Sequence, residues 1–263
     1  MMDDGQTTAP SESGLSIVIP AYNEERRLPR TLDEISRYSA RLGRSLEVLV
    51  CDDGSEDGTR ALVESRARGD PFLRLIALPH RGKGAAVRAG MLAATMPYLM
   101  LCDADLSMPI EDLDRFVVAL DQGCDLAVGS REGPGAQRYG EPARRHLMGR
   151  VFNLFVKLLV VRGLDDTQCG FKGFARRAAQ DLFARQRMDG FSFDAEILFL
   201  ARRRGYSMKV VGIDWYFNDD SRVRALPDTL RMTLDLLRIR LNDLRGRYRT
   251  ASGAVDSSED VLS

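Results

Sequence analysis

Short apolar runs alternate with longer amphipathic segments along the first half of the chain. Five runs are short and apolar enough to form strands, and they cover residues 15–20, 46–51, 72–78, 98–101 and 125–130. The segments between them repeat apolar residues every three or four positions, which is typical of helices that pack one face on a sheet. This alternation predicts an α/β fold with a mostly parallel sheet, flanked by helices and joined by right-handed crossovers.

The clearest helical pattern lies between the first two runs. Leu28, Leu32, Ile35 and Tyr38 fall on one face of a helix that we expect to end at about residue 42. Gly43 follows, and glycine often ends a helix because it adopts the left-handed conformation without strain. We expect the apolar face of this helix to pack against the sheet.

The alternation breaks past residue 131. The stretch 147–161 is nearly all apolar, apart from a narrow stripe formed by Arg150, Asn153 and Lys157. Two interpretations stay open. The stretch is either a core helix or a helix that lies in a membrane interface with its basic residues on the wet side.

The C-terminal part adds two helices and one strand to the prediction. We expect a helix over 194–204, a single strand over 207–217 and a last helix that begins at Pro227. Its leucines share one face: Leu230, Leu234, Leu237, Leu241 and Leu244. Residues 222–249 hold eight arginines and three acids. Such a basic amphipathic helix is either a solvated face or a surface that binds anionic lipids.

Composition excludes several classes of protein. The 263 residues include 38 basic and 38 acidic side chains, so the formal net charge of +0 gives no reason to expect a nucleic acid partner. No CxxC pair occurs, which predicts free thiols in a reducing compartment. No run reaches the ~18 apolar residues of a spanning helix, and the polar N-terminus lacks the apolar core of a signal peptide. We therefore expect a cytoplasmic protein.

Two carboxylates follow the fourth apolar run directly. Asp103 and Asp105 are two positions apart, so both point to the same side of an extended chain. They lie at the carboxyl end of a strand, where open α/β sheets bind ligands. Together they suit a hard divalent cation that in turn holds a diphosphate. An aspartate-capped turn into a helix near Pro109 is the alternative.

Polar residues also follow the other strands. They are Asn23, Glu24, Asp52, Asp53, Lys83 and Arg131. Folding brings these loops to one edge of the sheet, which predicts a site for a nucleoside diphosphate. Residues 82–84 lack the spacing of a Walker loop, and no GxGxxG follows the first strand, so a dinucleotide-binding fold is disfavoured.

These segments resemble a known family. Residues 15–25 (LSIVIPAYNEE), 50–59 (VCDDGSEDGT), 82–90 (GKGAAVRAG) and 103–105 (DAD) are similar to family-two inverting glycosyltransferases of the GT-A fold. Further segments resemble one branch of this family, the dolichyl-phosphate β-glucosyltransferases and their bacterial polyprenyl-phosphate relatives. They are 129–131 (GSR), 166–172 (DTQCGFK), 193–196 (FDAE) and 237–244 (LRIRLNDL). The resemblance implies a Rossmann-like GT-A sheet with C-terminal amphipathic helices.

The resemblance also implies a division of the chain. Residues 14–132 are the nucleotide-sugar-binding half, residues 133–225 the acceptor-binding half of the same domain, and residues 226–249 the amphipathic basic helix. Residues 1–13 and 250–263 are polar tails whose composition predicts disorder.

Site residues and a cofactor follow from the resemblance. The nucleotide pocket is expected to contain Pro20, Ala21, Tyr22, Glu24, Asp52, Asp53, Lys83, Asp103, Ala104 and Asp105. Asp103 and Asp105 also hold Mg²⁺ or Mn²⁺ in this view. Arg131, Arg144 and Arg145 bind the acceptor's phosphate, for which guanidinium groups are well shaped.

Asp166 is the candidate base or orienting residue, with Asp194 and Glu196 behind it. A helix cap is the alternative for Asp194. The nucleophile implied here is a phosphate monoester, whose second pKa of about 6 makes it mostly a dianion at pH 7. We therefore expect positioning and electrostatics to outweigh base catalysis.

The implied reaction is inverting transfer of glucose from UDP-glucose to a polyprenyl or dolichyl phosphate at the cytoplasmic face of a membrane. The eukaryotic relatives carry an N-terminal membrane anchor that this sequence does not show, so we expect a peripheral protein held by its basic amphipathic helices on an anionic inner face. A GDP-mannose-dependent transferase, a catalytically silent protein of the same fold and a nucleotidyltransferase are the alternatives.

Overall fold

The structure is a computed structural model. It describes residues 14–142, 149–150, 153–154, 156, 160, 163–217 and 225–249, the stretch 225–230 by its backbone alone. The predictions for both tails, for Arg144 and Arg145, and for most of the stretch 147–161 lie outside these residues. Among its described residues, Val156 is buried and belongs to the core.

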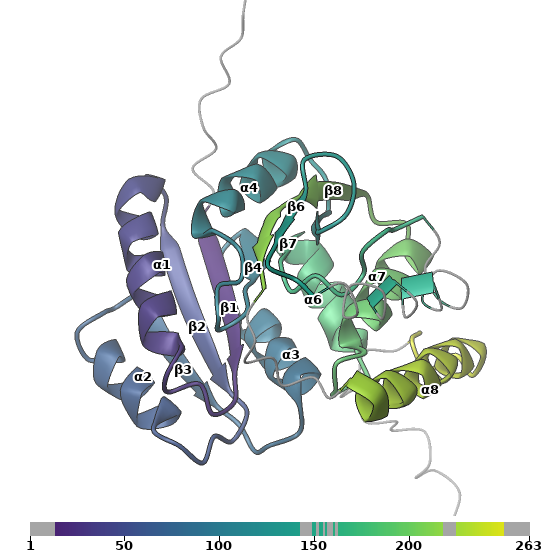
Figure 1. Cartoon of the computed structure of the whole chain (residues 1–263), viewed down its shortest axis with the longest axis horizontal. Coiled ribbons are helices and arrows are strands. Elements are labelled where there is room, and N and C mark those ends of the chain that lie inside the picture. The colour runs from purple at the N-terminus through teal and green to yellow at the C-terminus, as the bar shows by residue number, and fades with distance from the viewer. Residues whose placement is uncertain are drawn as a thin grey trace, which may run out of the picture.

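A seven-stranded sheet with the order β3-β2-β1-β4-β7-β5-β8 forms the centre of the molecule (Figure 1). Its strands are β1 (Leu15–Ala21), β2 (Leu46–Asp52), β3 (Leu73–Ala77), β4 (Tyr98–Leu101), β5 (Leu126–Ser130), β7 (Lys172–Ala175) and β8 (Met208–Gly212). Every strand except β7 runs in the same direction, and β7 is antiparallel to both of its neighbours, β4 and β5. The mostly parallel sheet is therefore confirmed.

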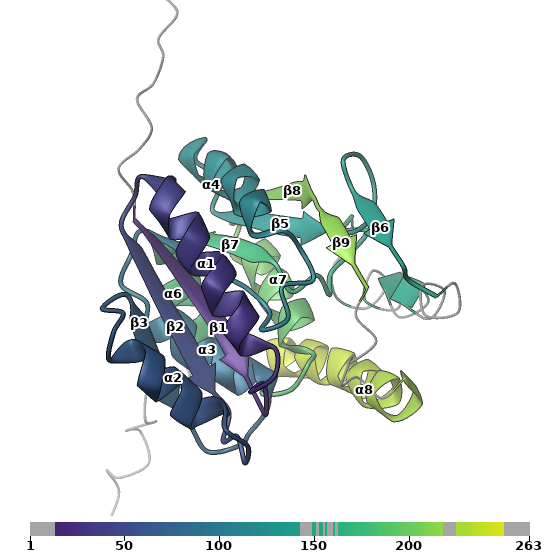
Figure 2. The same cartoon turned by 60° about the vertical axis from the view of Figure 1, so that its left-hand side comes forward.

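Helices cover both faces of the sheet (Figure 2). One face carries α1 (Leu28–Leu42), α2 (Thr59–Ala67) and, after the short 3-10 helix η1 (Ile110–Asp112), α4 (Leu113–Asp121). The other face carries α3 (Lys83–Ala93), α6 (Arg176–Arg185) and α7 (Phe193–Arg203). The last helix, α8 (Ala225–Leu244), packs beside α7. Two buried apolar clusters, one on each face, follow from this arrangement.

The helix predicted from Leu28, Leu32, Ile35 and Tyr38 is α1, and all four side chains are buried. Gly43 ends it with a φ of 62°, which is the left-handed conformation expected of a C-terminal glycine. The periodic signal and the glycine signal agree at this position, and the prediction is confirmed.

The single strand predicted over 207–217 is wrong. The chain leaves the large sheet after Gly212 and continues as β9 (Asp214–Tyr216), which pairs with β6 (Gln137–Tyr139) in a separate two-stranded sheet. A Cβ on Gly212 would lie 2.5 Å from the carbonyl oxygen of Pro134, so only glycine fits where the chain crosses between sheets. Both halves of the segment favour strands, and its apolar pattern therefore gives no sign of the break.

Helix α3 lies close against the sheet because Gly90 has no side chain. A Cβ there would lie 2.4 Å from Cγ1 of Val18 and 2.5 Å from Sγ of Cys51, both fully buried. This contact places the start of α3 beside the carboxyl ends of β1 and β4.

We expect Gly90→Ala to lower the free energy of unfolding by up to about 2 kcal/mol, because overpacking a core costs about 1–3 kcal/mol while helix propensity returns about 1 kcal/mol, and the two close contacts favour the upper end. Urea denaturation measures the change. Leu92→Ala, at a position of α3 that is 39% exposed, is the control and should cost less. A Gly90→Ala protein at least as stable as the original chain would contradict this packing.

Candidate active site

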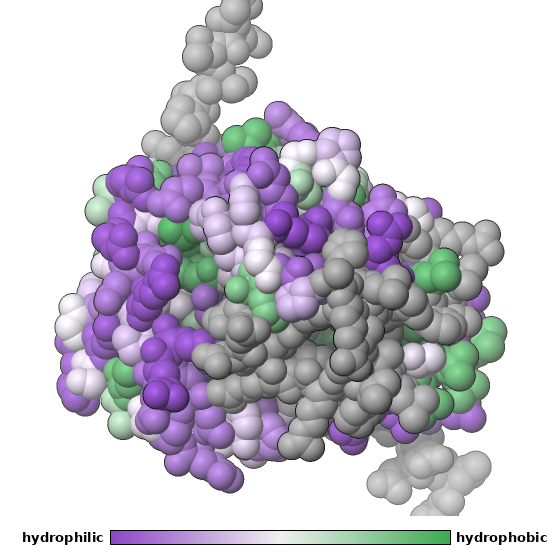
Figure 3. Space-filling model, viewed as in Figure 1, coloured by the Kyte–Doolittle hydropathy of each residue, from purple (hydrophilic) through white to green (hydrophobic). Residues whose placement is uncertain are grey.

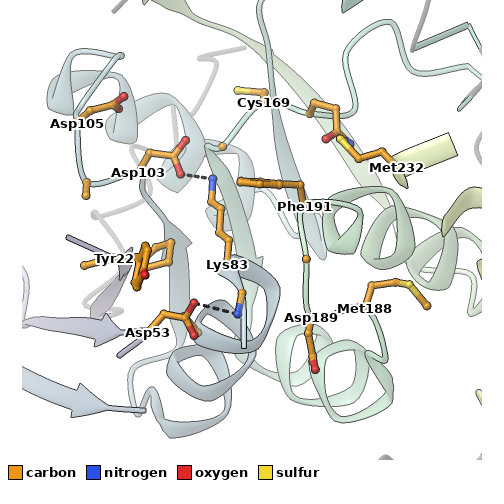
Figure 4. Close-up of a pocket in the computed structure, with 18 of the residues that line it drawn as sticks. Tyr22, Asp53, Lys83, Asp103, Asp105, Cys169, Met188, Asp189, Phe191 and Met232 are labelled. Atoms are coloured by element: carbon orange, nitrogen blue, oxygen red, sulfur yellow. Dashed lines mark hydrogen bonds and ion pairs between the residues drawn. The ribbon is translucent and has the colours of Figure 1, made fainter. Parts of the chain in front are cut away.

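A pocket of about 760 Å³ opens at the carboxyl ends of β1, β2 and β4. The loop after β1, the start of α3 and the loop after β4 form one side of it. The segment 187–191 and the middle of α8 form the opposite wall. Figure 4 shows Lys83 and Asp103 at its centre, with the ring of Phe191 across from them. Ligand sites of open α/β sheets lie at this edge.

An ion pair between Lys83 and Asp103 occupies the centre. Nζ of Lys83, the first residue of α3, lies 2.6 Å from Oδ1 of Asp103, which follows β4. Burial opposes ionisation of Asp103, but the ammonium group of Lys83 outweighs it and holds the pKa of Asp103 below its ordinary value. Burial likewise opposes the charge of Lys83, and the carboxylate of Asp103 raises the pKa of Lys83 above its ordinary value. Both groups are therefore charged.

Asp105 carries negative charge that is less well balanced. Its Oδ1 accepts a hydrogen bond of 3.2 Å from the amide of Ser107, and its ion pair with Arg27 is long, at 4.0 Å. Burial and, after it, the charge of Asp103 raise the pKa of Asp105. A cation placed beside these two carboxylates would relieve that repulsion.

Asp53 fixes the loop that leads into α3. Its carboxylate accepts hydrogen bonds of 2.9 Å from the backbone N–H groups of Arg81 and Gly82, and Nδ1 of His80 lies 2.8 Å from Oδ2. The ring of His80 stacks on Tyr22 with centroids 4.2 Å apart. Asp53 thus positions Lys83, and Tyr22 and His80 offer a flat apolar surface at the pocket.

Arg131 and Asp166 form a two-pronged ion pair. Nε and Nη2 of Arg131 lie 2.7 and 2.9 Å from the two oxygens of Asp166, and the backbone N–H of Arg131 donates to the same carboxylate. Although burial works the other way, Arg131 holds the pKa of Asp166 far below its usual range. The guanidinium group of Arg131 also lies 5.3 Å from the ring centroid of Trp215. Asp166 therefore orients Arg131, which itself lines the pocket.

Asp194 lies behind the pocket in a second buried ion pair. Its Oδ1 is 2.6 Å from Nζ of Lys172, which also donates to the carbonyl oxygen of Cys169. Burial raises the pKa of Asp194. Ser192 is the N-cap residue of α7 and Asp194 is the second residue within the helix, so the helix-cap alternative is not what the structure has.

Glu196 joins two distant segments. One oxygen accepts hydrogen bonds from the amides of Arg187 (3.0 Å) and Met188 (2.8 Å), and the other accepts one of 2.6 Å from the hydroxyl of Tyr248. Arg187 strengthens the link, because its Nε and Nη2 both donate to the carbonyl oxygen of Arg247. Glu196 therefore fastens the segment after α8 to a wall of the pocket.

The pocket gathers most of the residues predicted from the sequence. It is lined by Pro20, Ala21, Tyr22, Glu24, Asp53, Lys83, Asp103, Ala104, Asp105 and Arg131. Four predicted residues lie outside its lining: Asp52, Asp166, Asp194 and Glu196. Asp52 is buried and accepts a hydrogen bond of 3.2 Å from the amide of Ser55, so Asp53 is the member of the Asp52–Asp53 pair that reaches the pocket.

Sequence reasoning missed a whole wall of the pocket. The segment 187–191, Trp215 and, from α8, Arg231, Met232, Asp235 and Arg238 also line it. One signal was present in the glycines that flank Lys83. A Cβ on Gly84 would lie 2.5 Å from the carbonyl oxygen of Met188, and one on Gly82 would lie 2.6 Å from that of Asp189. Such glycines mark the close approach of another backbone.

The donor set of the pocket fits a hard divalent cation that is shared with a ligand. Asp103 and Asp105 supply carboxylate oxygens, and among the described residues no third histidine, cysteine or acid joins them in a cluster. Mg²⁺ is commonly held in this way, by one or two carboxylates with water and substrate phosphate oxygens completing the shell.

Comparison with known proteins decides the family. The sequence model of glycosyl transferase family 2 matches residues 16–183. The chain belongs to glycosyl transferase family 2. The predicted family and the prediction of a glycosyltransferase are thereby confirmed.

Two similar relatives carry the same name. The dolichyl-phosphate β-glucosyltransferase of Drosophila melanogaster is 36% identical over 253 residues, which cover 90% of this chain and 78% of that protein. The protein of the same name from Saccharomyces cerevisiae is 33% identical over 256 residues, or 89% of this chain and 76% of that protein.

Solved structures of other sugar-transferring enzymes share the fold. Glucosyl-3-phosphoglycerate synthase from Mycobacterium tuberculosis, in complex with Mn²⁺, UDP and glucosyl-3-phosphoglycerate, matches with a TM-score of 0.63 at 20% identity, covering 92% of this chain and 82% of that chain. Mannosyl-3-phosphoglycerate synthase from Rubrobacter xylanophilus matches with a TM-score of 0.64 at 19% identity, covering 89% and 76%. The predicted Rossmann-like GT-A fold is confirmed.

Glu196 should make stability depend on pH near neutrality. Burial raises its pKa from 4.5 to about 7, so the folded protein holds this proton more tightly than the unfolded chain. Its contribution to stability is full below pH 4.5 and is lost as the pH rises to about 7, on the order of 3 kcal/mol. Glu196→Gln keeps an acceptor for the two amides and has no proton to lose.

Urea denaturation from pH 5 to 8 should therefore show the original chain losing stability relative to Glu196→Gln. Glu64→Gln, on the exposed side of α2, is the matched control and should follow the original chain. If the free energies of unfolding of the original chain and of Glu196→Gln differed by the same amount across this pH range, ionisation of Glu196 would be excluded as the cause of the pH dependence.

Proposed function

We propose that this family 2 glycosyltransferase transfers glucose from UDP-glucose to a polyprenyl phosphate of the dolichyl type, with inversion at the anomeric carbon. The observation that carries the proposal is the pocket itself. It brings Lys83, Asp103 and Asp105 together at the carboxyl edge of the sheet, in a chain whose relatives across 90% of its length are dolichyl-phosphate β-glucosyltransferases.

The donor's nucleotide would lie along the ends of β1 and β2. Tyr22 and its stacking partner His80 present ring faces on which a planar base packs well. Lys83 supplies a fixed positive charge for the diphosphate, and Asp53 holds the loop that carries Lys83. Acceptor-only carboxylates also suit the hydroxyl and N–H donors of a ribose and a uracil.

Asp103 and Asp105 would hold a divalent cation, Mg²⁺ or Mn²⁺, together with the diphosphate. When bound, the ion neutralises negative charge on the leaving UDP. The chain's own contribution is to fix both carboxylates: Lys83 holds Asp103, the amide of Ser107 holds Asp105, and Gly170 leaves the room that Asp103 needs. A Cβ on Gly170 would lie 2.0 Å from Oδ2 of Asp103.

The acceptor needs little help from a base. A phosphate monoester has its second pKa at about 6 and is already a nucleophilic dianion at pH 7. Both carboxylate oxygens of Asp166 accept hydrogen bonds from Arg131, and the lowered pKa of Asp166 makes it a poor proton acceptor. We assign Asp166, Asp194 and Glu196 positioning roles, and we assign catalysis to the placement of donor and acceptor and to electrostatics.

We also propose that α8 seats the protein on an anionic membrane surface. Leu234, Leu237 and Leu241 are 51%, 51% and 43% exposed, and Leu244 is 83% exposed. Figure 3 shows apolar surface gathered over α8 at the lower right. Arg238 and Arg240 lie between the leucine positions and suit anionic headgroups. No helix of the described residues is long and apolar enough to cross a bilayer.

Asp105→Asn should separate activity from stability. We expect transfer of glucose to drop at least about 100-fold, since one ligand of the cation is lost. The melting temperature should rise, because the amide removes the repulsion with Asp103 that raises the pKa of Asp105. UDP release at saturating Mn²⁺ and thermal unfolding measure the two effects.

Asp33→Asn, which removes an exposed carboxylate on α1, is the control and should change neither value much. An Asp105→Asn protein that retains near-normal turnover would remove Asp105 from the cation site. A donor screen with UDP-glucose and GDP-mannose tests the choice of sugar nucleotide in the same assay.

The membrane proposal predicts that Leu237→Gln combined with Leu241→Gln weakens binding to anionic vesicles at least about tenfold, because burial of each leucine contributes about 1.5–3 kcal/mol. Co-sedimentation measures it. Val118→Gln combined with Val210→Gln removes two exposed apolar side chains, 52% and 50% exposed, away from α8 and should bind normally. Equal loss in both double variants would contradict the assignment to α8.

A further inference from the structure

Helix α8 belongs to the pocket as well as to the proposed membrane face. Arg231, Met232, Asp235 and Arg238 line the pocket from this helix. Figure 4 shows Met232 beyond Phe191, on the opposite side from Lys83 and Asp103. This wall therefore faces the donor site across the space that an acceptor would enter.

Of the four arginines that line the pocket from outside α8, three are paired with a carboxylate, and Arg187 donates instead to the carbonyl oxygen of Arg247. Arg27 binds Glu24 with two nitrogens, at 2.6 and 2.7 Å. Arg81 lies 2.7 Å from a carboxylate oxygen of Asp189. Arg131 is held by Asp166 through Nε and Nη2 at 2.7 and 2.9 Å. An incoming phosphate would have to compete with a carboxylate at each of these positions.

The two arginines of α8 are more exposed than Arg27 and Arg131, and Arg238 resembles Arg81, whose side chain is 63% exposed. Arg231 is exposed, and no carboxylate among the described side chains forms an ion pair with it. Arg238 gives Nη1 to Asp235 at 2.8 Å, but its side chain stays 65% exposed. Asp235 is fixed in turn by the hydroxyl of Ser192 at 3.0 Å, so Arg238 is held by one nitrogen while much of its guanidinium group meets solvent.

Both arginines adjoin the exposed leucines. Leu234 lies three residues after Arg231 and four before Arg238, and Leu241 lies three residues after Arg238. Residues three and four apart are neighbours on a helix surface. One helix therefore carries the exposed leucines and, next to them, the two guanidinium groups that line the pocket.

We propose that Arg231 and Arg238 bind the phosphate monoester of the lipid acceptor at the entrance of the pocket. The inference rests on the proposed function and adds a binding site to it. A membrane lipid with an apolar chain and a dianionic head would meet the leucines with its chain and the guanidinium groups with its head. Arginine suits such a phosphate because it donates two parallel hydrogen bonds.

A bilayer-free assay separates this site from general attraction to anionic lipids. The acceptor is geranyl phosphate, a water-soluble prenyl monophosphate, and the donor is UDP-glucose with Mn²⁺. The double variant Arg231→Gln/Arg238→Gln should raise the KM for geranyl phosphate about tenfold or more, the loss expected for charge-assisted hydrogen bonds. The KM for UDP-glucose should stay within about twofold, which also reports an intact fold.

Arg245→Gln is the matched control. Combined with Arg249→Gln, it removes the same two positive charges from the segment directly after α8, at exposed positions that do not line the pocket, and should leave both KM values unchanged. Unchanged KM for geranyl phosphate in the double variant, with loss of vesicle binding alone, would assign the arginines to membrane lipids and overturn the inference while the proposed function stands. Failure of the original chain to glucosylate any prenyl phosphate would overturn the proposed function and this site with it.

Discussion

The pocket depends on one constraint, which is that charges below the surface of a protein must be paired. Three ion pairs meet at the carboxyl edge of the sheet, and each joins residues far apart in the chain: Lys83–Asp103, Arg131–Asp166 and Lys172–Asp194. Pairing therefore fixes the loops as well as the charges. Asp105 lies beside these pairs but outside them: its ion pair with Arg27 is long, and its pKa is raised by burial and by the charge of Asp103.

Strand β7 is what brings these pairs together. It enters the sheet antiparallel between β4 and β5, so its start lies beside the end of β4. Lys172, its first residue, is fully buried and faces Asp194, and the preceding Gly170 packs directly on Asp103. Without this strand, the buried Lys172–Asp194 ion pair that lies behind Asp103 would be missing, and the carboxylates after β4 would be less well ordered. The interruption of the parallel sheet is therefore part of the site.

The N-terminal half of the fold was predictable from the sequence because local signals there agree with the tertiary structure. Apolar runs, helix periodicity and Gly43 each gave the right element, and the carboxyl-edge rule placed Lys83, Asp103 and Asp105 in one pocket. The antiparallel direction of β7 and the break after Gly212 were not predictable in this way. Both depend on which strands become neighbours, and a strand's own residues do not encode its neighbours.

The same reason explains the predicted residues that do not line the pocket and the lining residues that the sequence did not indicate. Asp166 and Glu196 are acidic residues in promising motifs, but their partners, Arg131 and Tyr248, come from distant segments and bind both carboxylates outside the pocket lining. The wall formed by residues 187–191 and α8 has no motif of its own. It exists because Gly82 and Gly84 let its backbone approach α3. Sequence motifs therefore located the donor side far better than the acceptor side.

Helix α8 shows why the acceptor side needed a structure. The leucine spacing correctly placed Leu234, Leu237 and Leu241 on one face, yet that face is exposed, and Leu236 and Ile239 are the residues that pack in the core. A third face, with Arg231 and Arg238, lines the pocket. Soluble proteins seldom leave an apolar stripe of this size open without a partner. Because one helix carries all three faces, helix geometry, and not a flexible loop, sets the distance between the exposed leucines and the arginines that line the pocket.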